Sequence, residues 1–275
     1  MRFLLLTILA LSLTSCFQAR PQQDPIARPP AVTINAKPPQ VPTIPSPPQV
    51  APRFTSQEIS GITFEGVAFD SRNARLIVVD QPDGPGSQFT DAAAAADAHG
   101  GIAAINAGFF TPEGAPLGFV VASGKIAGNW NSTSSLGSGV WFETRSGITA
   151  ITRRENLGRS RAYATQELIQ AGPLLVIDGK VVSGLETTKS SVRTLILSDG
   201  NTRWWIGRSS PCTLAALSQA LSIAQPASWP IQQALNLDGG RSSDLWVANT
   251  VSGGPIVRRA PWNRPVRNFL VLTKR

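Results

Sequence analysis

The sequence predicts an α+β fold, a single domain of mixed or antiparallel sheets with a few packed helices. Short apolar runs, alternating or β-branched, recur along most of the chain and are typical of strands. Only two segments carry a helical pattern, and strands do not alternate regularly with helices, which argues against a doubly wound sheet. Apolar residues make up 42% of the 275-residue chain, which is enough for a sizeable core.

The expected strands follow one another closely from residue 62 onward. Alternating or β-branched runs predict strands at residues 62–70, 75–80, 101–106, 118–121, 125–126, 140–143, 148–152, 233–237 and 266–272. Two further apolar segments, 173–182 and 194–206, contain Asp178-Gly179 and Asp199-Gly200. Because Asp-Gly between apolar strands is a strong hairpin signal, each segment is expected to fold back on itself.

Two helices are expected. An alanine-rich run predicts a short helix with Thr90 or Asp91 near its N-cap. A Ser-Ser-Pro sequence predicts the start of a second helix with Pro211 in its first turn, and Leu217 and Leu221 share one apolar face of this helix. The second helix is therefore expected to lie on a sheet.

The N-terminal part of the chain differs in composition from the rest. Residues 1–15 combine a basic start with an apolar run too short to span a bilayer, as in an export signal. Leu-Thr-Ser-Cys at 13–16 resembles the bacterial lipobox, which implies a mature N-terminus at Cys16 that carries lipid on a membrane; a plain secretory signal is the alternative. Residues 16–53 hold this cysteine and a tether with eleven prolines, and 54–275 form the predicted domain. The expected location is the cell envelope, with the domain outside the cytoplasm.

Charge and the rarest residue types exclude several functions. The net charge is +8, but five of the 25 cations and one of the 17 acids precede residue 54, which leaves +4 for the domain. Nucleic acid is therefore not an expected partner. The single His99 excludes a His-rich metal site and any Ser-His-Asp triad that does not use it. With Cys16 acylated, Cys212 has no disulfide partner and is expected in the core.

Four glycine-rich or polar turns stand at the ends of apolar strands. They are Asn-Ala-Gly-Phe-Phe at 106–110, Gln-Ala-Gly-Pro at 170–173, Ser-Val-Arg-Thr at 191–194 and Asn-Leu-Asp-Gly-Gly-Arg-Ser-Ser at 236–243. Strand ends can bring such turns together as a site on a rigid frame. Each turn alone has a plain structural explanation, as a cap, a tight turn or a solvated cation.

Together and in this order, the four turns resemble the phosphodiester glycosidase family, from about residue 64 to 272. The resemblance implies a hydrolase that cleaves a glycosidic bond in a sugar phosphodiester of an envelope or extracellular glycan. The family pattern has glycine where this chain has Ala107, and a third small residue where it has Arg241. Alanine fits at 107 only if the backbone there has a negative φ.

The resemblance also implies which residues bind and act. The expected substrate-binding residues are Asn106, Gly108, Arg193, Thr194, Gly239, Gly240, Ser242 and Ser243. Arg193 is expected to clamp two phosphate oxygens, since a guanidinium binds them in parallel. The Gly-Gly turn is expected to form an anion-binding nest with the neighbouring hydroxyls. Asp238 is expected to be catalytic, as base or nucleophile, or to hold sugar hydroxyls.

Glycosidic cleavage ordinarily uses two carboxyl groups. Glu113, in the loop after Phe110, is the second expected catalytic residue, ahead of Asp244 and Glu65. A phosphate is a good leaving group, so an arginine could instead stabilise the departing charge.

The missing second carboxylate and the two departures favour an alternative, a non-catalytic surface lipoprotein that binds anionic glycans. A third hypothesis is an envelope scaffold that uses the tether and the tryptophans. No metal or other cofactor is predicted, although a divalent cation such as calcium stays open because oxygen ligands such as Asp238 suit hard cations.

Overall fold

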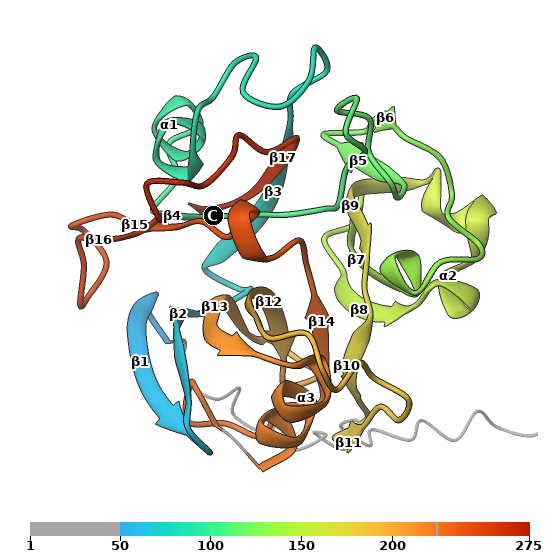
Figure 1. Ribbon diagram of the computed structural model, residues 1–275. Helices are drawn as coiled ribbons and strands as arrows, with labels where there is room; N and C mark the ends of the chain where they lie inside the picture. Colours follow the sequence, from blue (N-terminus) through green and yellow to red (C-terminus); the bar gives the residue numbers. More distant parts are fainter. Residues whose placement is uncertain (1–49, 224) are drawn as a thin grey trace, which may run out of the picture. The chain divides into compact units, whose positions relative to one another are not determined.

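The computed structural model describes residues 50–223 and 225–275, whose strands form three antiparallel sheets (Figure 1). The first sheet has the order β1 (Arg53–Ile59), β2 (Ile62–Asp70), β13 (Arg203–Cys212), β12 (Ser191–Ser198), β14 (Gln233–Asn236), β10 (Leu174–Ile177) and β11 (Lys180–Val181). The second has the order β16 (Ile256–Arg258), β15 (Leu245–Val247), β4 (Ala103–Asn106), β17 (Asn268–Lys274) and β3 (Ala74–Asp80). The third has the order β6 (Lys125–Ala127), β5 (Val120–Ala122), β9 (Thr165–Ala171), β7 (Gly139–Thr144) and β8 (Thr149–Arg153).

Few helices accompany the sheets. They are α1 (Ala92–Ala98), α2 (Arg154–Ala162), α3 (Leu214–Ile223) and two 3-10 turns, η1 (Ser135–Gly137) and η2 (Gly240–Ser242). The predicted α+β class with a single domain is confirmed, and the fold is mostly antiparallel sheet.

Both Asp-Gly hairpins form. Asp178 and Gly179 both have positive φ, 50° and 72°, which is the requirement of a two-residue hairpin turn, and Ile177 pairs with Lys180 across it. The second hairpin has a longer loop, because Asp199 Oδ1 accepts hydrogen bonds from the backbone N–H groups of Asn201 and Arg203.

The second predicted helix begins later than expected. Residues 209–212, including Pro211, continue strand β13, because Ser209 pairs with β2 and Cys212 pairs with β12. Helix α3 then starts at Leu214, and the Thr213 hydroxyl accepts a hydrogen bond from the N–H of Ala216. The ladder bonds on both sides of β13 thus outweigh the helix-start signal of the proline.

The first sheet has a hydrophobic layer on each face. Trp204 and Trp205 are adjacent in β13 and point to opposite faces, and both are fully buried. One face packs against the other two sheets, and α3 covers the opposite face with Leu217 and Leu221. Cys212 lies buried in the layer under α3, as expected for a core residue.

A buried carboxylate joins the second and third sheets. Glu167 on β9 is fully buried, and its Oε2 accepts hydrogen bonds from the N–H of Val78 on β3 at 2.9 Å and of Ser123 at 3.2 Å. Arg75 lies 3.9 Å from the same carboxylate. Burial raises the pKa of Glu167, and these donors oppose the rise.

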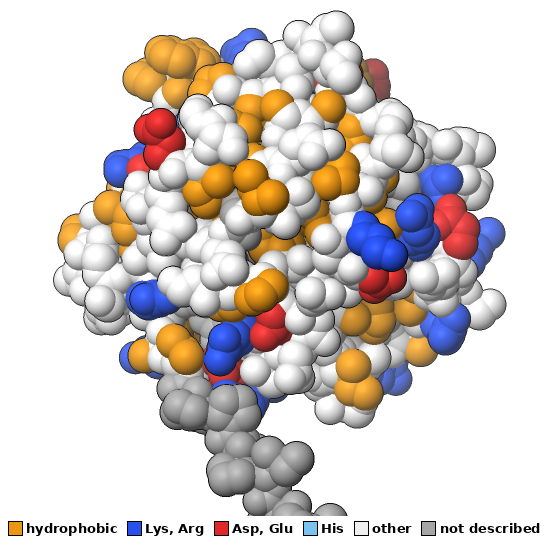
Figure 2. All heavy atoms as spheres, turned by 90° about the horizontal axis from the view of Figure 1, so that it is seen from below, with side chains coloured by type: hydrophobic (Ala, Val, Ile, Leu, Met, Phe, Trp, Pro, Cys, Tyr) orange, Lys and Arg blue, Asp and Glu red, His pale blue; other side chains and the backbone are white. Residues whose placement is uncertain are grey.

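Charged side chains are spread thinly over the surface. Figure 2 shows one face on which lysines and arginines lie singly or beside acids rather than in a basic field. Among residues 50–223 and 225–275, no helix has the length and apolar character needed to cross a bilayer. The predicted signal peptide, Cys16 and nearly all of the tether lie outside the described residues.

Candidate active site

The Asp-Gly-Gly turn lies where the first and second sheets meet. Strand β14 ends at Asn236, and the chain then passes through η2 into β15 of the second sheet (Figure 1). The N–H of Leu237 donates to Thr194 O at 2.8 Å, and the N–H of Asp238 donates to Ala107 O at 2.9 Å. Three of the four predicted segments therefore converge at Asp238, although residues 191–194, expected as a turn, form the first part of strand β12. The fourth segment contacts Asn236 at the end of β14, because Asn236 Nδ2 donates to Gly172 O at 2.9 Å.

Asn106 holds these turns together from the end of β4. Its side chain is fully buried, and its Nδ2 donates to Asp238 O at 2.6 Å. Its Oδ1 accepts from Thr194 Oγ1 at 2.8 Å and from the N–H of Asp244 at 3.0 Å. Asn106 and Thr194, both expected to bind substrate, are here buried and bonded to protein groups, which makes them positioning residues in this structure.

Ala107 and Gly108 lie against the start of β17. Asn268 accepts at its backbone oxygen from the N–H of Ala107 at 3.0 Å, and its Oδ1 accepts from the N–H of Gly108 at 2.7 Å. Ala107 is not among the residues with positive φ, so alanine is accommodated here without backbone strain. Asn268 Nδ2 is buried and has no hydrogen-bond partner among the described residues.

Asp238 is a buried carboxyl group with one unsatisfied oxygen. The residue is 7% exposed, and its Oδ1 accepts from the N–H of Gly239 at 2.9 Å. Its Oδ2 has no hydrogen-bond partner within the described part of the chain, and Arg264 Nη2 lies 3.7 Å away. Burial raises the pKa of Asp238, while the Ser242 hydroxyl and the Arg264 charge act in the opposite direction. A carboxyl group in this state can donate a proton at a higher pH than an ordinary aspartate.

Arg264 is the site residue that the sequence did not single out. Its Nε donates to Ser242 Oγ at 3.1 Å, and its guanidinium lies 4.6 Å over the ring of Phe110. Its side chain is 48% exposed, so solvent reaches the guanidinium beside Asp238. Two arginines stand in the Arg-Pro-Val-Arg-Asn sequence at 264–268, just before the last strand, but the local pattern predicted only a strand from residue 266.

Arg193 lies near the Asp-Gly-Gly turn but is bonded elsewhere. Its Nη2 donates to Lys189 O at 2.8 Å, its Nε donates to Cys212 O at 3.3 Å, and Glu186 lies 3.9 Å away. A Cβ on Gly239 would lie 2.6 Å from Val192 O, so only glycine fits where the turn crosses this strand. The aliphatic part of the Arg193 side chain therefore lies against the turn, while its guanidinium binds the carbonyl groups of Lys189 and Cys212.

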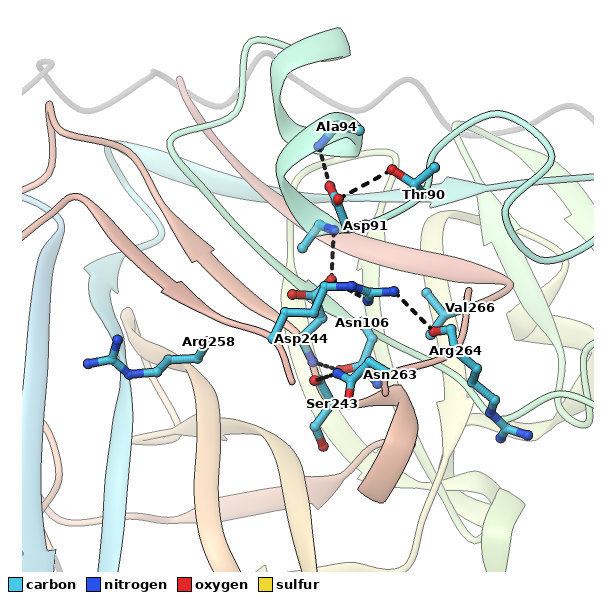
Figure 3. A network of polar contacts seen from close by, with 12 residues as sticks. Thr90, Asp91, Ala94, Asn106, Ser243, Asp244, Arg258, Asn263, Arg264 and Val266 are labelled. Atoms are coloured by element: carbon cyan, nitrogen blue, oxygen red, sulfur yellow. Dashed lines mark hydrogen bonds and ion pairs between the residues drawn. The ribbon is translucent and has the colours of Figure 1, made fainter. Parts of the chain in front are cut away.

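The serines and Asp244 form a network beneath the turn (Figure 3). Ser242 and Ser243 are buried, and Ser243 O accepts a hydrogen bond from Asn263 Nδ2. Asp244 Oδ2 accepts from the N–H of Ala92, the first residue of α1, and from Arg259 Nη1, each at 2.9 Å. This carboxylate anchors helix α1 and is not directed at Asp238.

The other candidate carboxylates differ in setting. Glu113 lies on the exposed loop after Phe110, where the Thr111 hydroxyl holds its pKa below the usual range. An ionised, exposed carboxylate is unsuited to donate a proton but can accept one. Glu65 on β2 forms an ion pair with Arg258 of β16 at 2.7 Å, so its carboxylate is engaged away from Asp238. Within the described ranges, no three side chains of the metal-ligating acidic, His or Cys types gather as a metal site.

A buried carboxyl group of raised pKa lies beside an exposed guanidinium on an antiparallel α+β frame, which is the arrangement of a candidate enzyme active site. The family model of phosphodiester glycosidase matches residues 99–273, and the chain belongs to this family.

Solved structures share the fold. The catalytic domain of zebrafish N-acetylglucosamine-1-phosphodiester alpha-N-acetylglucosaminidase, auto-inhibited by its pro-peptide, is similar with a TM-score of 0.54 and 16% identity over 82% of each chain. A hypothetical protein from Synechocystis has a TM-score of 0.51 and 17% identity, over 82% of this chain and 61% of that one. A protein described as exported, from Burkholderia pseudomallei, has a TM-score of 0.50 and 13% identity, over 77% and 74%. No curated protein sequence matches the chain.

Proposed function

We propose that this protein hydrolyses the glycosidic bond of a sugar phosphodiester in an envelope or extracellular glycan, with Asp238 as its central catalytic residue. The observation that carries the proposal is the Asp238 carboxyl group, which is buried, has a raised pKa and keeps Oδ2 without a hydrogen-bond partner among the described residues. Membership of the phosphodiester glycosidase family supports the class of reaction.

In the proposed reaction, water attacks the anomeric carbon of the sugar and the bond from this carbon to the phosphate oxygen breaks. Protonated Asp238 donates its proton to the departing oxygen, which leaves a phosphomonoester and a free sugar. The proton of the attacking water passes to a carboxylate, for which Glu113 is the candidate because it is exposed on the loop that follows Phe110. Its loop is joined to the site by Phe110, which pairs with Pro116 and contacts Arg264.

The rest of the turn would hold the substrate close to Asp238. The Gly239-Gly240 turn would contribute backbone N–H groups to an anion-binding nest, and Gly240 adopts a φ of 61°, which glycine tolerates without strain. Asn106 and Thr194 would act indirectly, by fixing the backbone on either side of Asp238.

The proposal includes attachment of the domain to a membrane of the cell envelope through lipid on Cys16. Its support is the lipobox-like Leu-Thr-Ser-Cys sequence and the proline-rich residues that follow it. A tether of this composition would hold the domain away from the lipid surface.

The test is the release of free sugar from a panel of sugar-1-phosphodiesters and aryl glycosides by the full-length protein in detergent. Asp238→Asn keeps the shape of the side chain and should lower kcat by at least about a hundredfold, because the amide cannot donate the acid proton. Asp244→Asn is the matched control, since that carboxylate is also buried but bonded to α1 and Arg259. Binding of these compounds without turnover would instead support the glycan-binding alternative.

A further inference from the structure

We propose that Arg264, rather than Arg193, is the residue that binds the phosphate group of the substrate. This inference rests on the proposed function, because it assigns the anionic part of the same substrate. It is carried by the position of the guanidinium, 3.7 Å from Asp238 and 48% exposed, and by the donors that it leaves open.

Arg264 has unused hydrogen-bond donors that face the site. A guanidinium carries five N–H donors. Nε is bonded to Ser242, whereas Nη2 approaches Asp238 Oδ2 only to 3.7 Å, beyond hydrogen-bond distance. Within the described part of the chain, neither terminal nitrogen has a hydrogen bond. Two parallel N–H groups on one side of a guanidinium match two oxygens of a phosphate.

The guanidinium is held in place before any ligand arrives. Ser242, which accepts from Nε, is fully buried, and the ring of Phe110 lies under the guanidinium plane. The Arg264 backbone is also fixed, because its N–H donates to Arg241 O at 2.9 Å. Figure 3 shows its side chain extending away from the Asp244 network, so its charge is not shared with that carboxylate. Such a fixed fork binds an anion with little loss of side-chain entropy.

The charges around the turn favour the same assignment. Arg193 donates from Nε and Nη2 to two carbonyl groups, and its side chain is only 11% exposed, so one side of its fork is already occupied and little of it reaches solvent. Among the described residues, the acidic neighbour of Arg264 is Asp238, and burial raises the pKa of that carboxyl group. Because the contact of Arg264 with Asp238 is 3.7 Å long, beyond hydrogen-bond distance, its terminal nitrogens remain open to a bound anion.

The test measures binding of inorganic phosphate to the full-length protein by thermal shift, without any need for turnover. Arg264→Gln should weaken phosphate binding at least about tenfold, and Arg264→Lys should recover part of it, because lysine keeps the charge but not the fork. Arg241→Ala is the matched control. This neighbouring arginine is exposed and bonded through Nε to Trp262 O, and its loss should change binding less than about twofold.

The outcomes separate this inference from the proposed function. The assignment is overturned if Arg264→Gln still binds phosphate, or if Arg241→Ala loses binding to the same extent. It is also overturned if binding depends on Arg193 instead, or if the wild-type protein binds no phosphate. Arg264-dependent binding without any sugar release upholds the phosphate site and contradicts hydrolysis. Circular dichroism of each variant, with its unfolding temperature in phosphate-free buffer, confirms that the site was tested in folded protein.

Discussion

Replacing Asn106 with alanine should lower the free energy of unfolding by about 2 to 6 kcal/mol. Three hydrogen bonds disappear, and two of the partners, Asp238 O and the N–H of Asp244, are left buried without a partner. Each orphaned group costs about 1 to 3 kcal/mol. The Thr194 hydroxyl is spared, because it can turn to Ser243 Oγ at 3.2 Å.

Asn268→Ala provides the matched comparison. Asn268 is also fully buried, and truncation removes the same atoms, but among residues 50–223 and 225–275 its side chain makes one hydrogen bond, from the N–H of Gly108. Its loss should therefore cost about 1 to 3 kcal/mol, roughly half of the cost at Asn106. Urea unfolding of both variants measures the difference, provided that the two denaturant slopes agree.

The reasoning fails if Asn106→Ala is no more destabilised than Asn268→Ala. Water that filled the cavity and bonded both orphaned groups would give such a result. If the network does position Asp238, sugar release should also fall in Asn106→Ala while the variant is still folded, because a displacement of about 1 Å can cost a hundredfold in rate.

Three further predictions concern stability and attachment. Asp238→Asn should raise the unfolding temperature at neutral pH but not in acid, because a raised folded-state pKa means that stability falls as pH rises through the ionisation of this carboxyl group. Glu167→Ala should cost about 3 kcal/mol in urea unfolding, since the N–H groups of Val78 and Ser123 lose their acceptor. Cys16→Ser should abolish metabolic labelling of the protein with palmitate and release it from the membrane fraction.

These predictions have clear contrary results. Equal unfolding temperatures of wild type and Asp238→Asn across the pH range would mean that burial of this carboxyl group carries no cost. Wild-type stability of Glu167→Ala would show that water replaces the carboxylate between the two sheets, with Glu167→Gln as the isosteric control. Palmitate labelling that persists in Cys16→Ser would favour the plain secretory signal.

Local patterns predicted the hairpins better than the ends of elements. Asp178-Gly179 specifies its turn through positive φ at two successive residues, which is a property of those residues themselves. Strand β13 instead runs through Pro211, because strands β2 and β12 pair with it on either side. The partner residues on β2 lie more than a hundred residues away in sequence, and those on β12 lie about twenty residues away. Strands β2 and β3 were correctly expected as strands, yet they belong to different sheets, which no local pattern reveals.

The candidate site was predictable in its turns but not in the direction of its side chains. The strand ends carrying Asn106, Thr194 and Asp238 do converge, as their positions suggested. Sequence could not show that the Asn106 amide faces inward, or that Arg193 bonds to neighbouring carbonyl groups while Arg264 reaches Asp238. Those outcomes depend on the crossing of two sheets, which only the folded chain defines.

The position of β17 sets the order in which the site can be completed. This strand is the last of the described elements to be synthesised, yet it lies between β3 and β4 inside the second sheet. Asn268 at its start supports Ala107 and Gly108, and Arg264 just before it reaches Asp238. Without residues 264–275 the second sheet would lose the strand that joins β3 to β4, and the site would lose the Arg264 guanidinium. Completion of the site therefore depends on a long-range strand pairing, which local contacts cannot replace.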